Sequence, residues 1–143
     1  MTRYFDSSAL VTFLVEEPGT PFVRRLMASG TAATSRLSEV ELTSAVARRL
    51  REGTVPRAHG ERLTVNVHAA IQEMAVVELT PEVVFSARGL LLRHALRAGD
   101  AVQLASATCL QAQLGQPVPF VAFDQALVRV ARAEGLTVID SVK

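Results

Sequence analysis

The chain has 143 residues, of which 49% are hydrophobic, and its formal net charge at pH 7 is +1. This length suits one domain with its own hydrophobic core, so we expect a single domain over 1–143. The one cysteine, Cys109, excludes an internal disulfide and a zinc site of the Cys-x-x-Cys type. No apolar run approaches the length of a membrane span and no targeting segment is recognisable, so a cytoplasmic protein is expected.

Lysine is almost absent, because every basic residue except Lys143 is an arginine. A Walker-type phosphate loop needs an internal Gly-Lys pair, and receiver-type phosphoacceptor domains depend on an interior lysine, so both classes are disfavoured. Arginine is the better bidentate ligand for phosphate, but a compositional bias towards Ala, Val and Arg explains the same counts. Both interpretations of the arginines stay open at this point.

Short apolar runs alternate with helical patterns along the whole chain. The runs are continuous rather than alternating in polarity, which favours a parallel sheet covered by helices on both faces. The expected fold class is therefore α/β, with a mostly parallel central sheet of four to five strands flanked by helices. In chain order the pattern predicts a strand at 3–6, helices at 7–15 and 21–27, a strand at 31–35, helices at 36–51 and 56–73, a strand at 75–79, helices from 80 to about 96 and at 99–114, a strand at 119–123, a helix at 125–134 and a strand at 137–139.

Three aspartates fall where predicted strands end or helices begin. Asp6 ends the first strand, Asp124 follows the strand PFVAF, and Asp100 opens the helix in the stretch LRAGDAVQLASA. Sites in open parallel sheets form outside the carboxyl ends of the strands, so we expect these three side chains along one edge. Each aspartate taken alone also suits a helix cap or a favourable charge in a first turn.

Glu41 lies inside the predicted helix 36–51 and has no cation three or four positions away, so no ion pair along the helix is available to it. Glu39, by contrast, sits three residues from Arg36 and is interpreted as an ordinary surface acid. Glu41 is either a solvated glutamate or a fourth acid of the predicted site.

Carboxylates gathered in a partly buried site repel one another, and a divalent cation removes that repulsion. Oxygen ligands with water in the remaining positions suit Mg²⁺ or Mn²⁺. Zinc is disfavoured because His59, His68 and His94 are scattered without ligand spacing. Such a metal activates water and stabilises the oxygens of a phosphoryl displacement, which predicts a phosphate ester substrate.

Four arginines lie near the predicted acids in the sequence. Arg93 and Arg97 flank the Asp100 region, and Arg48 and Arg51 continue the helix of Glu41. They are candidate contacts for the phosphates of a polyanion such as RNA, and each one also suits a solvated helix face.

Four segments, in order and over essentially the whole chain, resemble the successive signatures of PIN-domain proteins and, more narrowly, of VapC-type toxins of toxin–antitoxin pairs. The segments are YFDSSALV with the following EEPG, TSRLSEVELTSAV, LRAGDAVQLASA, and FVAFDQALVRVARAEGLTVID. The resemblance implies a parallel α/β sheet flanked by helices and an endoribonuclease that depends on Mg²⁺ or Mn²⁺. It also implies a homodimer and a small antitoxin whose tail enters the active-site groove.

The resemblance implies that four acids bind the metal and are catalytic: Asp6, Glu41, Asp100 and Asp124. This chain departs from the family pattern at Ala122, where many members carry Thr or Ser two residues before the last acid. The predicted reaction is attack of activated water on an RNA phosphodiester, leaving 5′-phosphate and 3′-hydroxyl ends. No side-chain nucleophile is needed, in line with the absence of a Ser-His or Cys-His signature.

Two alternatives remain beside this hypothesis. One is a non-catalytic PIN-like module that binds RNA or a protein and acts as a regulator. The other is a Mg²⁺ phosphatase or phosphotransferase of another α/β family, which is disfavoured because Ser8, rather than a second aspartate, follows Asp6 by two residues.

Overall fold

The computed structural model describes residues 1–140, and within them lies a five-stranded sheet in the order β3-β2-β1-β4-β5. All of its strand pairs are parallel. The central strand β1 pairs with β2 on one side and with β4 on the other, so the direction of strand addition reverses at β1. The strands are β1 (Thr2–Phe5), β2 (Thr31–Ser35), β3 (Ala75–Val77), β4 (Phe120–Val121) and β5 (Val138–Ile139).

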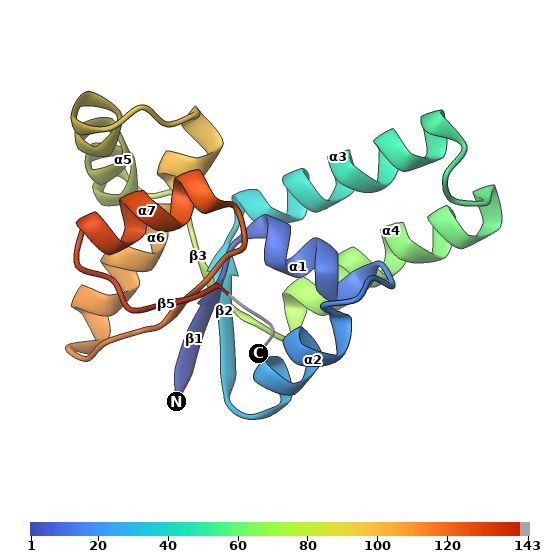
Figure 1. The fold of residues 1–143 in the computed structure, drawn as a ribbon, viewed down its shortest axis with the longest axis horizontal. Helices are drawn as coiled ribbons and strands as arrows, with labels where there is room; N and C mark the ends of the chain where they lie inside the picture. Colours follow the sequence, from blue (N-terminus) through green and yellow to red (C-terminus); the bar gives the residue numbers. More distant parts are fainter. Residues whose placement is uncertain (141–143) are drawn as a thin grey trace.

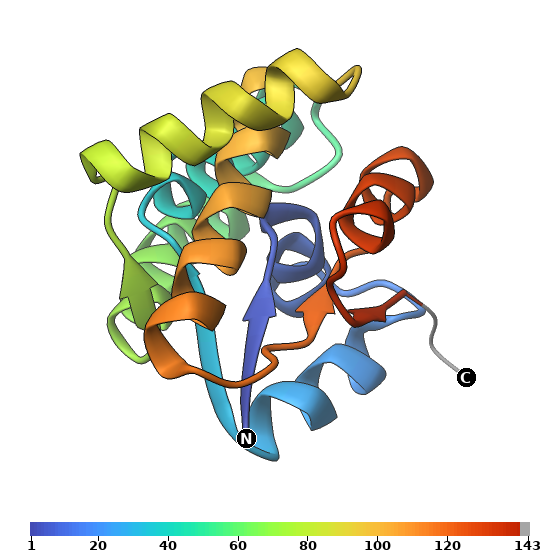
Figure 2. The same ribbon diagram turned by 90° about the vertical axis from the view of Figure 1, so that its left-hand side faces the viewer.

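Helices cover both faces of the sheet and form a three-layer architecture (Figure 1). The helices α1 to α4 lie on one face, and α5, α6 and α7 lie on the other; Figure 2 shows α6 in front of the strands, with α5 above them. The pair α3 and α4 projects beyond the sheet as an arm (Figure 1). The helices are α1 (Ser7–Leu14), α2 (Thr20–Ala28), α3 (Leu37–Glu52), α4 (Arg57–Gln72), α5 (Pro81–Arg93), α6 (Ala98–Leu114) and α7 (Gln125–Ala133).

The two layers of helices bury separate hydrophobic cores, and consecutive residues of β1 enter one each. Tyr4 packs under α5, α6 and α7 and stacks on Phe120 with ring centroids 5.6 Å apart. Phe5 points to the opposite face, into the core under α1 to α4. Successive side chains of a strand alternate between the faces, so a strand buried on both sides is apolar without interruption. Burial of each of these aromatic rings contributes about 2 kcal/mol.

Every predicted helix and strand is present, and the predicted parallel sheet is confirmed with five strands in residues 1–140. The largest shift of a helix boundary is at α5, which ends at Arg93 rather than near Leu96. His94 adopts an extended conformation, with φ −136° and ψ 152°, so the chain leaves the helix there and turns back into α6. No helix within residues 1–140 combines the length and the apolarity needed to span a membrane.

Candidate active site at the carboxyl edge of the sheet

A cleft of about 790 Å³ lies at the carboxyl ends of β1 and β4, where the strand order reverses. Ligands of doubly wound sheets bind at such switch points, because the loops after neighbouring strands diverge there and leave a crevice. Four segments far apart in the sequence each contribute one acid to its lining: the end of β1, α3, the first turn of α6, and the residue before α7. We call these four, Asp6, Glu41, Asp100 and Asp124, the cleft acids; Glu17, in the segment between α1 and α2, also lines the cleft.

Asp6 is both a helix cap and the most buried of the four acids, with 3% of its surface exposed. Its Oδ1 accepts a hydrogen bond from the Ala9 N–H at 2.9 Å, and the Ser8 hydroxyl lies 2.9 and 3.0 Å from the two carboxylate oxygens. Burial is the main reason that the pKa of Asp6 rises to about 7, and the charges of Asp100 and Glu41 add to it against the effect of the bonds from Ala9 and Ser8. The sequence offered two interpretations of Asp6, a helix cap and a residue of the cleft, and the structure is compatible with both at once.

Glu41 has a partner on another helix. The Gln103 side chain on α6 donates from Nε2 to Glu41 Oε1 at 2.7 Å. On the other side of the carboxylate, a Cβ at Gly99 would lie 2.7 Å from Glu41 Oε2, so the carboxylate rests close to the backbone of the first turn of α6. Glu41 is thus held between α3 and α6 rather than solvated on a helix surface.

Asp100 and Asp124 are the more open acids of the cleft. Asp100 lies in the first turn of α6 with its side chain 26% exposed, and Arg97 Nε is 3.5 Å from its Oδ2. The Arg97 side chain is 83% exposed, so this pair is weak. Asp124 is exposed and caps α7, accepting from the N–H groups of Ala126 at 2.9 Å and Leu127 at 3.1 Å.

The cleft acids have little compensating positive charge. Within residues 1–140, Arg97 is the one cation at ion-pair distance from any of them. No three His, Cys, Asp or Glu side chains in this part of the chain converge tightly enough to enclose an ion by themselves. Mg²⁺ uses one or two carboxylates and keeps several waters, so an open set of oxygen donors around a buried, raised-pKa carboxylate fits a hydrated Mg²⁺ or Mn²⁺.

Comparison with known proteins agrees with this geometry. The PIN domain family model matches residues 3–133. The chain belongs to the PIN domain family. The resemblance seen in the four sequence segments is thereby confirmed. This PIN domain is 37% identical over 140 residues to Ribonuclease VapC45 of Mycobacterium tuberculosis, an alignment that covers 94% of this chain and 92% of the relative.

Solved structures share the fold at low sequence identity. The crystal structure of VapBC2 from Rickettsia felis, bound to a DNA fragment from their promoter, matches with a TM-score of 0.71 at 12% identity over 99% of both chains. A toxin–antitoxin complex from Klebsiella pneumoniae matches with a TM-score of 0.69 at 12% identity, covering 99% of this chain and 98% of the other. These likenesses establish the fold of this PIN domain as a whole.

Some of the arginines predicted as phosphate contacts line the cleft in the structure, and others do not. Arg48 and Arg97 line the cleft, and so does Arg49, which the sequence did not single out. Arg93 instead donates from Nη2 to Glu134 Oε1 at 2.9 Å, and neither it nor Arg51 is among the residues that line the cleft. The sequence could not separate them, because the partner of Arg93 lies 41 residues further along the chain.

Sequence reasoning also missed Gln103 and Gly99, the two residues that flank the Glu41 carboxylate. A signal for Gln103 exists: it is a polar residue within AVQLASA, an otherwise small and apolar stretch of α6 that the fold buries. Ala122, where the resemblance predicted a residue with a hydroxyl group, is completely buried in the core beneath α5, α6 and α7.

Proposed function

We propose that this chain is a VapC-type endoribonuclease that depends on Mg²⁺ or Mn²⁺ and acts as the toxin of a toxin–antitoxin pair. The observation that carries the chemistry is the meeting of four acids from distant segments in one cleft at the carboxyl edge of the sheet. A relative named as a ribonuclease, 37% identical over nearly the full length of both chains, supports the same conclusion.

Asp6 and Asp100 are proposed to hold the metal directly, with Glu41 and Asp124 binding it directly or through water. When bound, Mg²⁺ supplies activated water and offsets the negative charge that develops on the phosphodiester oxygens. Asp6 is pre-positioned for this role, because Ser8 and the N-terminus of α1 fix its carboxylate before any ligand arrives.

Arg48, Arg49 and Arg97 are proposed to contact RNA phosphates, since they border the same cleft as the acids. Positive side chains at its border draw a polyanion towards acids that would otherwise repel it. Their contribution to binding falls as the salt concentration rises, so truncation of Arg49 to alanine is expected to reduce the salt dependence of RNA binding.

Cleavage of a labelled single-stranded RNA tests the function. We expect cleavage with Mg²⁺ or Mn²⁺, loss of cleavage with EDTA, recovery on re-addition of metal, and products with 5′-phosphate and 3′-hydroxyl ends. Binding of RNA without metal-dependent cleavage would reject the nuclease and favour a non-catalytic regulatory module. Metal-dependent hydrolysis of small phosphoesters but not of RNA would favour a phosphatase.

The partners proposed are an antitoxin and a second copy of the chain. A solved structural neighbour is itself a toxin–antitoxin complex, and the cleft is open to a segment of another protein. For the homodimer, α5 presents Phe85, 77% exposed, and Leu92, 89% exposed, one heptad apart and so on the same helix face. We expect light scattering to report a dimer for the wild type and a monomer for the double variant Phe85→Glu, Leu92→Glu. The far-ultraviolet circular dichroism spectrum of the variant should match that of the wild type, which would indicate that the variant is folded.

A further inference from the structure

Gln103 is a buried amide with every polar end engaged. It is 1% exposed, its Oε1 accepts from the Tyr4 hydroxyl at 2.6 Å, and its Nε2 donates to Ser38 Oγ at 3.0 Å and to Glu41 Oε1 at 2.7 Å. A buried polar group is costly unless such bonds are made, so this arrangement has one favourable orientation. Gln103 therefore links the core of the sheet to an acid of the cleft.

The bonds behind Gln103 decide which end of the amide faces Glu41. Tyr4 is completely buried, and its hydroxyl donates to Gln103 Oε1. Turning the amide over would set its oxygen against the Glu41 carboxylate, so that two acceptor oxygens would face each other. That mismatch leaves Nε2 directed at Glu41.

Ser38 anchors the other bond of Nε2 to the sheet. Its Oγ lies 2.6 Å from the Thr34 hydroxyl, and that hydroxyl donates to the carbonyl oxygen of Phe5 at 2.7 Å. Phe5 precedes Asp6, so the network runs from the backbone that carries one cleft acid to the side chain of another. A fully satisfied buried network of this kind specifies one geometry.

Gly99 restrains Glu41 from the opposite side. A methyl group there would lie 2.7 Å from Glu41 Oε2, a contact closer than side chains tolerate. The atom it meets is the end of a flexible side chain, so alanine at this position moves the carboxylate rather than the helix. Alanine is otherwise favoured over glycine within a helix.

We propose that Gln103 is a positioning residue that, held by Tyr4 and Ser38, fixes the Glu41 carboxylate against the backbone at Gly99 in the geometry needed for metal binding. The inference rests on the proposed function in one respect, that Glu41 takes part in holding the metal. Partners that orient metal ligands from behind change metal affinity or activity by about 10- to 100-fold when they are removed.

The test is the variant Gln103→Met, which keeps the length of the side chain and removes the amide. We expect Mn²⁺, titrated into the protein without RNA and followed by electron paramagnetic resonance, to bind about tenfold or more weakly than to the wild type. We also expect kcat for RNA cleavage to fall and KM for RNA to stay unchanged, because Gln103 is buried away from the substrate.

Gln111→Met is the matched control. Gln111 lies on the same helix, and its Oε1 accepts from the backbone N–H of Val118 at 2.9 Å, at a place that does not line the cleft. The variant loses the same amide and some thermal stability, and we expect its Mn²⁺ affinity to match the wild type. Equal loss of Mn²⁺ affinity in both variants would overturn the proposal, because it would indicate a general loosening of α6.

Gly99→Ala approaches Glu41 without disturbing the buried network, and it serves even if Gln103→Met does not fold. We expect weaker Mn²⁺ binding with a melting temperature equal to or above that of the wild type. Wild-type Mn²⁺ affinity in Gly99→Ala and in a folded Gln103→Met overturns the inference. If the wild type does not cleave RNA, the proposed nuclease is rejected. Weaker Mn²⁺ binding in the two variants would still support the positioning role, so the two failures are distinguishable.

Discussion

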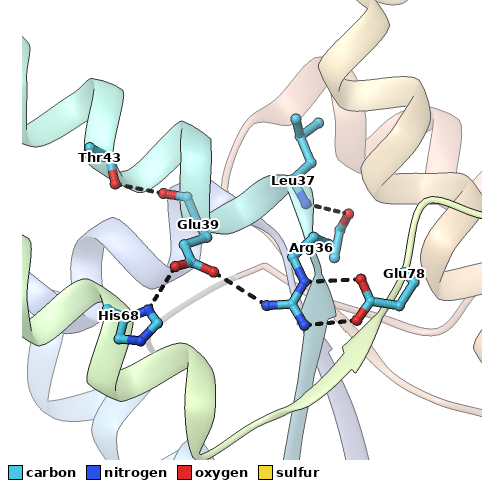
Figure 3. Close-up of polar contacts among 7 residues, drawn as sticks. Arg36, Leu37, Glu39, Thr43, His68 and Glu78 are labelled. Atoms are coloured by element: carbon cyan, nitrogen blue, oxygen red, sulfur yellow. Dashed lines mark hydrogen bonds and ion pairs between the residues drawn. The ribbon is translucent and has the colours of Figure 1, made fainter.

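Two groups of carboxylates on this molecule are treated in opposite ways. The surface cluster, consisting of Arg36, Glu39, His68 and Glu78, pairs each acid with a cation (Figure 3). Arg36 reaches both Glu78 oxygens at 2.9 and 2.7 Å, and His68 Nδ1 lies 2.8 Å from Glu39. The cleft acids, by contrast, line one cleft, and within residues 1–140 Arg97 is the one cation at ion-pair distance from any of them.

The difference appears in the pKa values. The hydrogen bond from His68 lowers the pKa of Glu39, and that from Arg36 lowers the pKa of Glu78. Burial and like charges raise the pKa of Asp6 to about 7. Glu39 and Glu41 lie two residues apart on α3, so the same helix presents one acid to a compensated surface and another to an uncompensated cleft. Uncompensated acids cost stability, which is the usual mark of a site that binds something.

The largest expected effect is a loss of RNA cleavage when a cleft acid is changed, compared with no loss when an acid of the surface cluster is changed. Asp100→Asn removes a charged oxygen from the cleft and is expected to reduce the rate of RNA cleavage by about a thousandfold, since metal-assisted charge stabilisation contributes several kcal/mol. Glu39→Gln makes the same chemical change in the surface cluster and is expected to leave the rate unchanged. Single-turnover cleavage in Mg²⁺ measures both, and an active Asp100→Asn would rule out the assignment of this residue.

The next effect is a pH dependence of stability in the metal-free protein. Folding raises the pKa of Asp6 from its ordinary value of 3.8 to about 7, so between these values the folded state holds a proton that the unfolded state has lost. The free energy of unfolding therefore falls as pH rises from about 4 to about 7, by on the order of 4 kcal/mol at most.

Urea unfolding at several pH values in EDTA measures this dependence. Asp6→Asn keeps an oxygen for the helix cap and has no proton to lose, so its stability is expected to be flat where that of the wild type declines. Glu134 carries the opposite sign: hydrogen bonds from Arg93 and His94 lower its pKa, so its contribution is present above the ordinary glutamate pKa and is lost as pH falls through the lowered value. If the free energy of unfolding of the wild type stays as flat as that of Asp6→Asn between pH 4 and about pH 7, the raised pKa of Asp6 is contradicted.

Binding of the proposed metal is expected to offset the cost in stability of the cleft acids. Mg²⁺ at a hundred times its Kd is expected to add about 2.7 kcal/mol to the free energy of unfolding, because it binds the folded state alone. Thermal melts across a Mg²⁺ series should show this increase for the wild type and for Glu39→Gln, and little of it for Asp100→Asn. An equal Mg²⁺ response in Asp100→Asn would place the metal elsewhere.

The smallest effect concerns the surface cluster itself. Glu39→Gln removes the charge that faces Arg36 and His68, with 29% of the Glu39 side chain exposed. Pairs this open contribute less than about 1 kcal/mol, so the change in the free energy of unfolding is expected to be small and to shrink further in high salt. A loss as large as that from a core substitution would show that the surface cluster holds α3 to α4 more firmly than its exposure implies.

The order of the elements was predictable from the sequence by itself, because it depends on local signals. Continuous apolar runs become strands buried on both faces, and Gly53 and Gly115, with φ of 72° and 65°, end α3 and α6 where the sequence places them. The edge positions of Asp6, Asp100 and Asp124 were predictable for the same reason: a residue at the end of a parallel strand or the start of a helix has a fixed place relative to the sheet edge. Glu41 lies inside α3 and was singled out by its lack of a cation along the helix and by the family resemblance.

The tertiary structure alone decided the partners of Glu41 and Glu134. Gln103 lies 62 residues from Glu41 and 99 from Tyr4, and Arg93 finds Glu134 at a separation of 41. No periodicity in the sequence encodes such pairs, because they depend on how α3, α5, α6 and α7 pack across the sheet. The sequence thus determined where the carboxylates emerge, and packing determined which of them are compensated by a cation, which are fixed by a buried amide and which stay open to a metal.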